Sequence, residues 1–189
     1  MVFARYHNSL WDKMLAMVRL LAAAAMTMAL AAQERGSLLV ATEASRDPDF
    51  ARSVVLVIEH DAHHASGLMV NRPTRIALAE ALGAGRDTVW AGGPVLLGVN
   101  ALVRVKAAPA GADRVLPGIY LITDKRRMRA ELAAGHPMRV YVGMCGWGGG
   151  QLEGEVRRGL WRAVPGSAAL VFDPDPGTLW RRLSAGSLH

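Results

Sequence analysis

The sequence predicts a single compact α+β domain, in which a mixed or largely antiparallel β-sheet packs against three or four helices. Three observations favour this class. Short apolar, β-branched runs follow one another from Gly36 onward, turns rich in glycine and proline separate them, and only a few segments have helical periodicity. A chain of 189 residues, 51% hydrophobic and 20% charged, suits one domain with a buried core and is cramped for two.

The clearest expected strand is residues 52–59, whose uninterrupted apolar middle is typical of burial on both faces of a sheet. Residues 66–71 are expected to pair with it as a hairpin, with residues 60–65 as the loop. The other expected strands are residues 37–42, 88–90, 101–106, 118–122, 138–142 and 167–172.

Helices are expected where the apolar spacing is helical and capping residues flank the run. Residues 124–134 have Thr123 or Asp124 as the N-cap and Gly135 as the stop. A short helix at 76–82 ends before Gly83. The remaining expected helices are residues 150–161 and 178–184.

The N-terminal region has the pattern of a secretory signal peptide. After Arg19 an apolar run at residues 20–32 is too short to cross a hydrocarbon core of about 30 Å, but it suits the apolar part of a signal sequence. Residues 29–31, Ala-Leu-Ala, supply the small side chains that a signal peptidase needs. Met14 or Met17 is expected to be the true start, because either gives a shorter leader.

Two readings of this region stay open. In the first, residues 1–31 are removed and residues 32–189 form a mature periplasmic domain without a transmembrane span. In the second, the same residues form a buried or amphipathic helix of a cytoplasmic protein. The alanine-rich run has no polar face to turn toward solvent, which favours export.

The formal net charge of +6 raises the question of nucleic-acid binding. Of the 22 basic residues 19 are Arg, a bias that reflects genome composition more readily than a ligand. Removal of residues 1–31 leaves 19 basic and 15 acidic side chains, and a net charge of +4 is a weak electrostatic signal.

Two groups of arginines are expected on helices, where they form either solvated faces or a basic surface for phosphates. No helix-turn-helix spacing or base-stacking motif accompanies them. The residues are Lys125, Arg126, Arg127 and Arg129 in one group, and Arg157, Arg158 and Arg162 in the other.

Residues 143–155, here called the glycine segment, contain six glycines, the only cysteine and a tryptophan. A dinucleotide-binding loop is a weak interpretation, because Gln151 stands where the last glycine of the fingerprint should be and Trp147 fills the space of a pyrophosphate. No Lys-Ser or Lys-Thr follows, so a Walker loop is excluded. The structural interpretation is a tight turn in which Trp147 fills the core, and no cofactor is expected.

Cys145 is the only candidate nucleophile in this segment, and it would need a nearby histidine base. His60, His63, His64 and His136 are available. A lone cysteine among glycine and apolar residues is more often a small buried filler. We therefore expect no catalytic residue. The sequence also contains no hydrolase motif.

Residues 59–64, Glu-His-Asp-Ala-His-His, contain side chains that suit zinc, copper or nickel. In a hairpin loop His63 and His64 are equally well explained as solvated turn residues, and no distant Cys or His set completes a closed site. No metal is expected. The sequence leaves open whether His60, His63, His64 or Cys145 has a chemical role.

A series of short motifs then points to a family. In their order along the chain, from Gly36 to Trp161, these motifs resemble the bacterial YqgE/AlgH family, and Phe172 with Leu179 and Trp180 extends the likeness. The motifs are Gly36 to Ala41, Asp47 to Phe50, Arg52 to Val55, Glu59 to Asp61, Gly67 to Pro73, Gly92 to Val95, Gly146 with Trp147, Gln151 to Glu155, and Trp161.

This resemblance implies a compact α+β fold with a mixed sheet, no established enzymatic activity, no agreed catalytic or ligand residues, and a label of transcriptional regulator. The sequence departs from the family at Cys145, where a small alanine is common, and in the leader before Gly36. The function expected is a non-enzymatic, exported binding or scaffold domain with an unknown protein partner. The alternative is a cytoplasmic regulator that contacts nucleic acid through the arginine-rich helices.

The expected partner surface draws its residues from four of these motifs. It consists of Asn71, Arg72, Pro73, Gly92, Gly93, Pro94, Gly146, Trp147 and Gln151.

Overall fold

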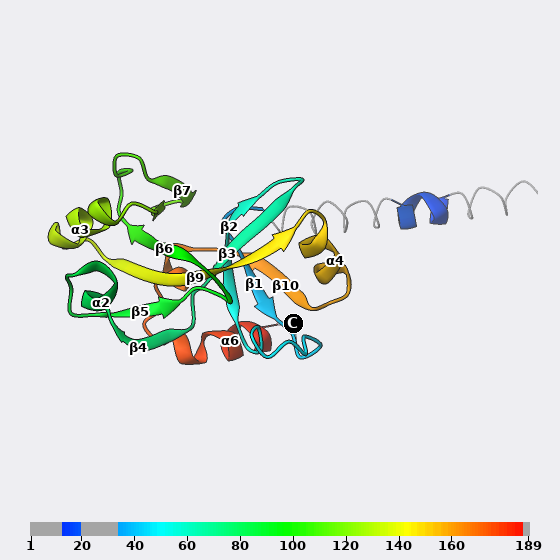
Figure 1. The fold of residues 1–189 in the computed structure, drawn as a ribbon. Helices are drawn as coiled ribbons and strands as arrows, with labels where there is room; N and C mark the ends of the chain where they lie inside the picture. The colour runs from blue at the N-terminus through cyan, green and yellow to red at the C-terminus, as the bar shows by residue number, and fades with distance from the viewer. Residues whose placement is uncertain (1–12, 20–33, 187–189) are drawn as a thin grey trace, which may run out of the picture. The chain divides into compact units, whose positions relative to one another are not determined.

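The computed structural model describes residues 13–19 and 34–186 (Figure 1). The chain divides into two compact units, Met1–Ala32 and Gln33–His189. In the first unit residues 13–19 are helical, and most of the expected signal peptide, residues 1–31, lies outside the described residues. Within the described ranges, no helix has the length and apolar character needed to cross a bilayer.

The second unit is an α+β domain, as the sequence predicts. Its described residues form a ten-stranded sheet in the order β10-β1-β2-β3-β9-β6-β8-β7, with β5 on β9 and β4 on β5. The strands are β1 (Ser37–Ala41), β2 (Val54–His60), β3 (His64–Met69), β4 (Pro73–Ala77), β5 (Thr88–Ala91), β6 (Val95–Arg104), β7 (Asp113–Leu116), β8 (Ile119–Ile122), β9 (Met138–Gly148) and β10 (Trp161–Pro165).

Five helices complete the described part of this unit. Figure 1 shows α2 and α3 together at one end of the domain and α4 near the other. The helices are α2 (Leu78–Leu82), α3 (Lys125–Ala133), α4 (Gln151–Arg157), α5 (Ala168–Val171) and α6 (Pro176–Ala185). The pairs within the sheet are antiparallel except β5 with β9, which is parallel.

The hairpin of β2 and β3 forms the centre of the sheet and confirms the prediction of a strand buried on both faces. Val55 pairs with Met69 and Leu56 with Leu68, and all four side chains are at most 2% exposed. Alternate residues of the strand belong to hydrophobic clusters on opposite faces of the sheet. Leu56 is in the cluster that contains residues of α5 and α6, whereas Val55 is in the cluster that contains Trp147 and Leu152 of α4. The loop is shorter than expected, because β2 includes His60 and β3 begins at His64.

The connection between β5 and β6 crosses over β9. Tyr141 of β9 pairs with Trp90 of β5 and also with Asn100 of β6, so β5 and β6 lie on opposite sides of β9. Only residues 92–94 join the two strands. This short link must therefore pass over the backbone of β9 where the glycine segment begins.

The order of elements near the C-terminus differs from the prediction. The expected helix 150–161 ends at Arg157, and Trp161 begins β10, which pairs with β1. Residues 167–172, predicted as a strand, instead contain the short helix α5, whose N-cap Ser167 accepts a hydrogen bond from the backbone N–H of Leu170. Strand β7 was not predicted, and β6 begins at Val95 rather than Ala101.

Candidate functional site

The first part of the glycine segment is β-strand, and only the part after it forms a turn. Residues up to Gly148 continue β9, which corrects the prediction that the strand ends at Val142, and Gly150 has φ 73° at the start of α4. Backbone lies against backbone here: a Cβ on Gly92 would stand 2.2 Å from the carbonyl oxygen of Gly143, and one on Gly93 2.3 Å from the carbonyl carbon of Met144. The glycines are required by the crossing of the two chains.

Trp147 packs in the core beside Phe50, Trp161 and α4 and is 4% exposed, as the space-filling interpretation predicts. Its ring lies 6.2 Å from that of Phe50 and 6.0 Å from that of Trp161, centroid to centroid. The indole N–H donates to Glu155 Oε2 at 2.9 Å, and Trp161 donates to the same oxygen at 2.8 Å. One carboxylate of α4 therefore satisfies two buried indole donors.

Asn71 and Arg72 hold the chain that leads into the β2–β3 hairpin. The Asn71 side chain accepts from the backbone N–H of Val54 at 2.8 Å and donates to the carbonyl of Arg52 at 3.0 Å. Arg72 donates to the carbonyl of Ala51 at 2.9 Å. These hydrogen bonds are contacts within the domain.

The nine residues of the expected partner surface therefore differ in accessibility. Gly92 and Trp147 are buried, Asn71, Arg72 and Gly93 are half-buried, and Pro73, Pro94, Gly146 and Gln151 are exposed.

Cys145 is fully buried, with its Sγ 3.5 Å from the carbonyl oxygen of Gly92. Burial raises the pKa of the Cys145 thiol far above its usual range, and the nearby positive charge of Arg72 only partly opposes this. The side chain is thus a neutral thiol at physiological pH, which favours its role as a small apolar filler.

The histidine-rich loop is held by a carboxylate of its own and by one of α4. Asp61 accepts from the backbone N–H groups of His63 and His64, and these bonds lower the pKa of the Asp61 carboxyl. The His64 ring lies 3.2 Å from Asp61 Oδ2, and His60 Nε2 lies 2.8 Å from Glu153 Oε1. Across residues 13–19 and 34–186, no three His, Cys, Asp or Glu side chains gather as a metal site requires.

Most basic side chains of α3 bind main-chain carbonyls. Lys125 donates to Ala81 and Arg129 to Leu82, at the end of α2, and Arg127 donates to Gly111. These donors join α3 to its neighbours instead of forming a free basic face.

The second arginine group is split between two elements. Arg157 belongs to α4 and Arg158 is its C-cap, and both are exposed. Arg162 lies in β10, not on a helix as expected, and donates to the carbonyl of Leu183.

An apolar surface that the sequence did not predict lies at the start of β6. Val95, Leu96 and Leu97, here called the apolar bulge, have exposures of 37%, 80% and 66%. The register with β9 shifts between Val95 and Val99, and Gly98 has φ 68°. On the side away from β9, β8 pairs only with residues 101–104, so among the described residues the bulge has a free edge.

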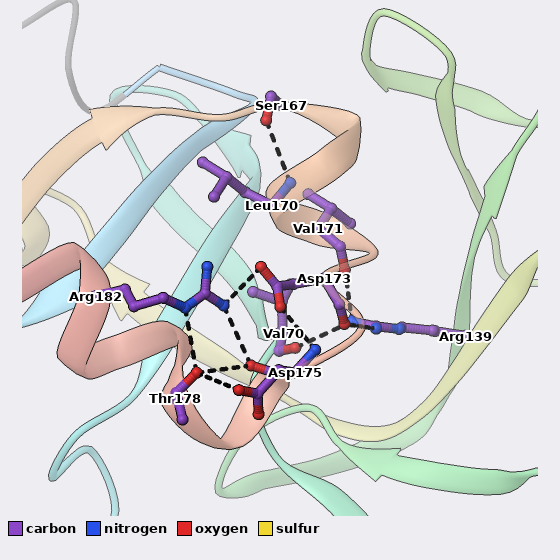
Figure 2. Close-up of polar contacts among 9 residues, drawn as sticks. All are labelled: Val70, Arg139, Ser167, Leu170, Val171, Asp173, Asp175, Thr178 and Arg182. Carbon is purple, nitrogen blue, oxygen red and sulfur yellow. Dashed lines mark hydrogen bonds and ion pairs between the residues drawn. The ribbon is translucent and has the colours of Figure 1, made fainter.

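A network around Arg139 joins β9 to the C-terminal helices (Figure 2). The Arg139 guanidinium donates to the carbonyls of Val70, Val171 and Asp173. Burial lowers the pKa of Arg139, although the group remains charged at neutral pH. The Asp173 carboxylate binds Arg182 of α6 at 2.7 Å. Burial raises the pKa of Asp173, but Arg182 and the backbone N–H of Asp175 together hold it below its usual value.

These features define an α+β protein with a largely antiparallel sheet, a glycine-lined crossover above the middle strand and an exposed apolar bulge beside it. A family profile described as AlgH-like (DUF179) matches residues 38–186. The chain belongs to the AlgH-like family, which confirms the resemblance drawn from its motifs.

Similar proteins come from several bacteria. The chain is 37% identical to a UPF0301 protein of Streptomyces avermitilis over 161 residues, which cover 78% of this chain and 83% of that one. A UPF0301 protein of Xanthomonas campestris is 35% identical over 157 residues, covering 76% and 84%. These names specify no activity.

Two solved structures have a similar fold. The solution structure of the AlgH protein from Pseudomonas aeruginosa has a TM-score of 0.66 and 28% identity, covering 80% of this chain and 86% of that one. A crystal structure of a Corynebacterium diphtheriae protein has a TM-score of 0.67 and 23% identity, covering 79% and 85%, and it is compared for the fold alone.

Proposed function

We propose that this protein works by binding another protein, without chemistry of its own, and that the apolar bulge contacts the partner. The observation that carries this proposal is the exposure of two consecutive leucines, 80% for Leu96 and 66% for Leu97. Single exposed apolar residues are common on soluble proteins, but adjacent ones on a free strand edge are typical of interaction sites.

The position of the bulge supports the same proposal. Leu96 Cδ2 lies 3.4 Å from where a Cβ on Gly143 would stand, and Val95 Cγ2 lies 3.8 Å from the equivalent point on Gly146. The bulge therefore adjoins the glycine segment, part of which was expected from the sequence to meet a partner. The crossing below it supplies a rigid base, which lowers the entropic cost of binding.

The size of the bulge favours a partner of a different kind from this chain. A stable dimer buries roughly 20–30 residues on each side. The bulge offers three apolar residues in succession, so it suits a smaller contact in which its leucines enter an apolar pocket of another protein.

Site-specific photocrosslinking in the native cell tests this proposal. With a benzoylphenylalanine replacing Leu97, we expect one discrete adduct that persists when Leu96→Met is added and disappears with Leu96→Ser. The same group in place of Arg157, exposed on α4, should not give this adduct. No adduct at position 97, an equal one at position 157, or an adduct with the mass of two copies would each contradict the proposal.

We also propose that this binding takes place in the periplasm after removal of residues 1–31. The sequence pattern of the leader supports this step. N-terminal sequencing of the native protein should give a first residue near Ala32. An intact start at Met1 or Met17 would contradict removal of the leader.

No observation favours the alternative of nucleic-acid binding, since most basic side chains of α3 bind carbonyls. Salt titration of DNA binding tests it, and we expect no salt-dependent complex even at low ionic strength.

A further inference from the structure

We propose that the hollow between α2, β5 and the start of β9 binds a small aromatic anion, which is a second site independent of the apolar bulge. The hollow has a volume of about 530 Å³. Small-molecule sites are concave, largely apolar and span about 300–1,000 Å³. The hollow thus has the size of a ligand site.

The wall of the hollow has apolar and polar surface in similar amounts, and part of the apolar surface is aromatic. Trp90 and Phe172 line it, together with Leu132 of α3 and Met138 of β9, and these side chains are only half-buried. A flat apolar molecule would cover them and remove apolar surface from water.

The polar side chains of the wall include both hydrogen-bond donors and acceptors. Trp147, Trp161 and Trp180 each donate an indole N–H to a carboxylate or carbonyl oxygen, whereas Trp90 donates to no described residue. His136 has one ring nitrogen on Glu131 and the other without a described partner. Asp87 is the only carboxylate of the wall. An acceptor atom on a ligand would match the indole N–H of Trp90.

Arg139 gives the hollow its charge. Its Cζ lies 3.9 Å from the centre of the Trp90 ring, its three hydrogen bonds go to carbonyls, and it also interacts with the Tyr141 hydroxyl. Within the described residues, no carboxylate oxygen approaches Arg139 closer than 4.0 Å. A carboxylate or sulfonate on an aromatic ligand would meet this positive charge.

Calorimetric titration with two probes tests this inference on the full chain. Naphthalene-1-sulfonate carries the anion, and 1-naphthalenemethanol is a neutral molecule of similar shape. We expect the sulfonate to bind at least about tenfold more tightly. Equal affinities, or no heat of binding with the sulfonate, would overturn the proposal.

Variants locate the site. Thr88 is exposed at the wall, so Thr88→Trp should fill the hollow and abolish binding without disturbing the core, whereas Arg157→Trp on α4 should leave it unchanged. Arg139→Gln should remove the preference for the sulfonate. Leu96→Ser should have no effect, because the apolar bulge is elsewhere. Full binding by Thr88→Trp, or loss with Leu96→Ser, would refute the assignment.

Discussion

Trp147 donates its indole N–H to Glu155 Oε2 at 2.9 Å, so the aromatic ring above the glycine segment is fixed by the helix that follows it. The contact explains why a tryptophan stands among glycines. It fills the core beside Phe50 and Trp161, and Glu155 of α4 satisfies its one polar group.

Glu155→Ala should therefore destabilise the domain strongly. The substitution leaves the indole N–H groups of Trp147 and Trp161 buried without an acceptor, at a cost of about 2–5 kcal/mol in total. Glu155→Gln keeps one carbonyl oxygen and should cost less. Urea denaturation followed by tryptophan fluorescence measures both, and equal stability of Glu155→Ala and wild type would be incompatible with this role.

Gly92→Ala should disrupt the chain crossing. Its Cβ would stand 2.2 Å from the carbonyl oxygen of Gly143, and the resulting shift should cost about 3 kcal/mol or more. The matched control is Gly146→Ala, whose Cβ meets only Val95 Cγ2 at 3.8 Å and should change stability little. Thermal unfolding of the two variants compares them directly, and similar melting temperatures would argue against a crossing that requires glycine.

Tyr141→Phe should keep or raise stability. The Tyr141 side chain is fully buried, and its hydroxyl has no hydrogen bond of good geometry among the described residues, although the Arg139 guanidinium lies close to it. Removal of an unsatisfied polar group is expected to stabilise by up to about 1–2 kcal/mol. Calorimetric unfolding gives the sign, and a clear loss of stability would mean that the hydroxyl has a partner.

Arg182→Gln should lower stability most at neutral pH. The folded pKa of Asp173 lies below its unfolded value of about 3.9, so the contribution is complete above that value and is lost as pH falls through the folded pKa. The variant should lose about 1–3 kcal/mol at pH 7 and show a shallower fall in stability below pH about 4.

Arg181→Gln is the control for this pair, because Arg181 is exposed on the same helix and forms no ion pair with a described residue. Urea denaturation at pH 7, 5, 4 and 3 measures both variants. The same pH profile for Arg182→Gln and wild type would exclude a coupling of Arg182 to Asp173.

The fold class and most strands could be predicted because their signals are local. The β-branched run at 52–59 and the N-cap at Asp124 each depend on neighbouring residues alone. The short apolar run at 167–172 is different, since its length and pattern do not distinguish a strand from a helix, and Ser167 caps α5.

The elements that the sequence could not place depend on distant partners. Trp161 starts a strand because it pairs with Ala41 of β1. Residues 143–148 remain in a strand because residues 92–94 cross above them and β3 pairs beside them. The exposure of Leu96 and Leu97 also depends on where β8 ends, which is not a property of their own segment.

The central claim is that the apolar bulge is covered by a protein partner in the cell, and cysteine protection measures this most directly. Cys145 is the only natural cysteine and is buried, so Leu97→Cys introduces one reactive thiol. We predict that a maleimide labels Leu97→Cys in the native cell at least about tenfold more slowly than in the purified protein, and labels Arg157→Cys equally in both. Equal labelling rates of Leu97→Cys in the cell and in the purified protein would contradict the claim.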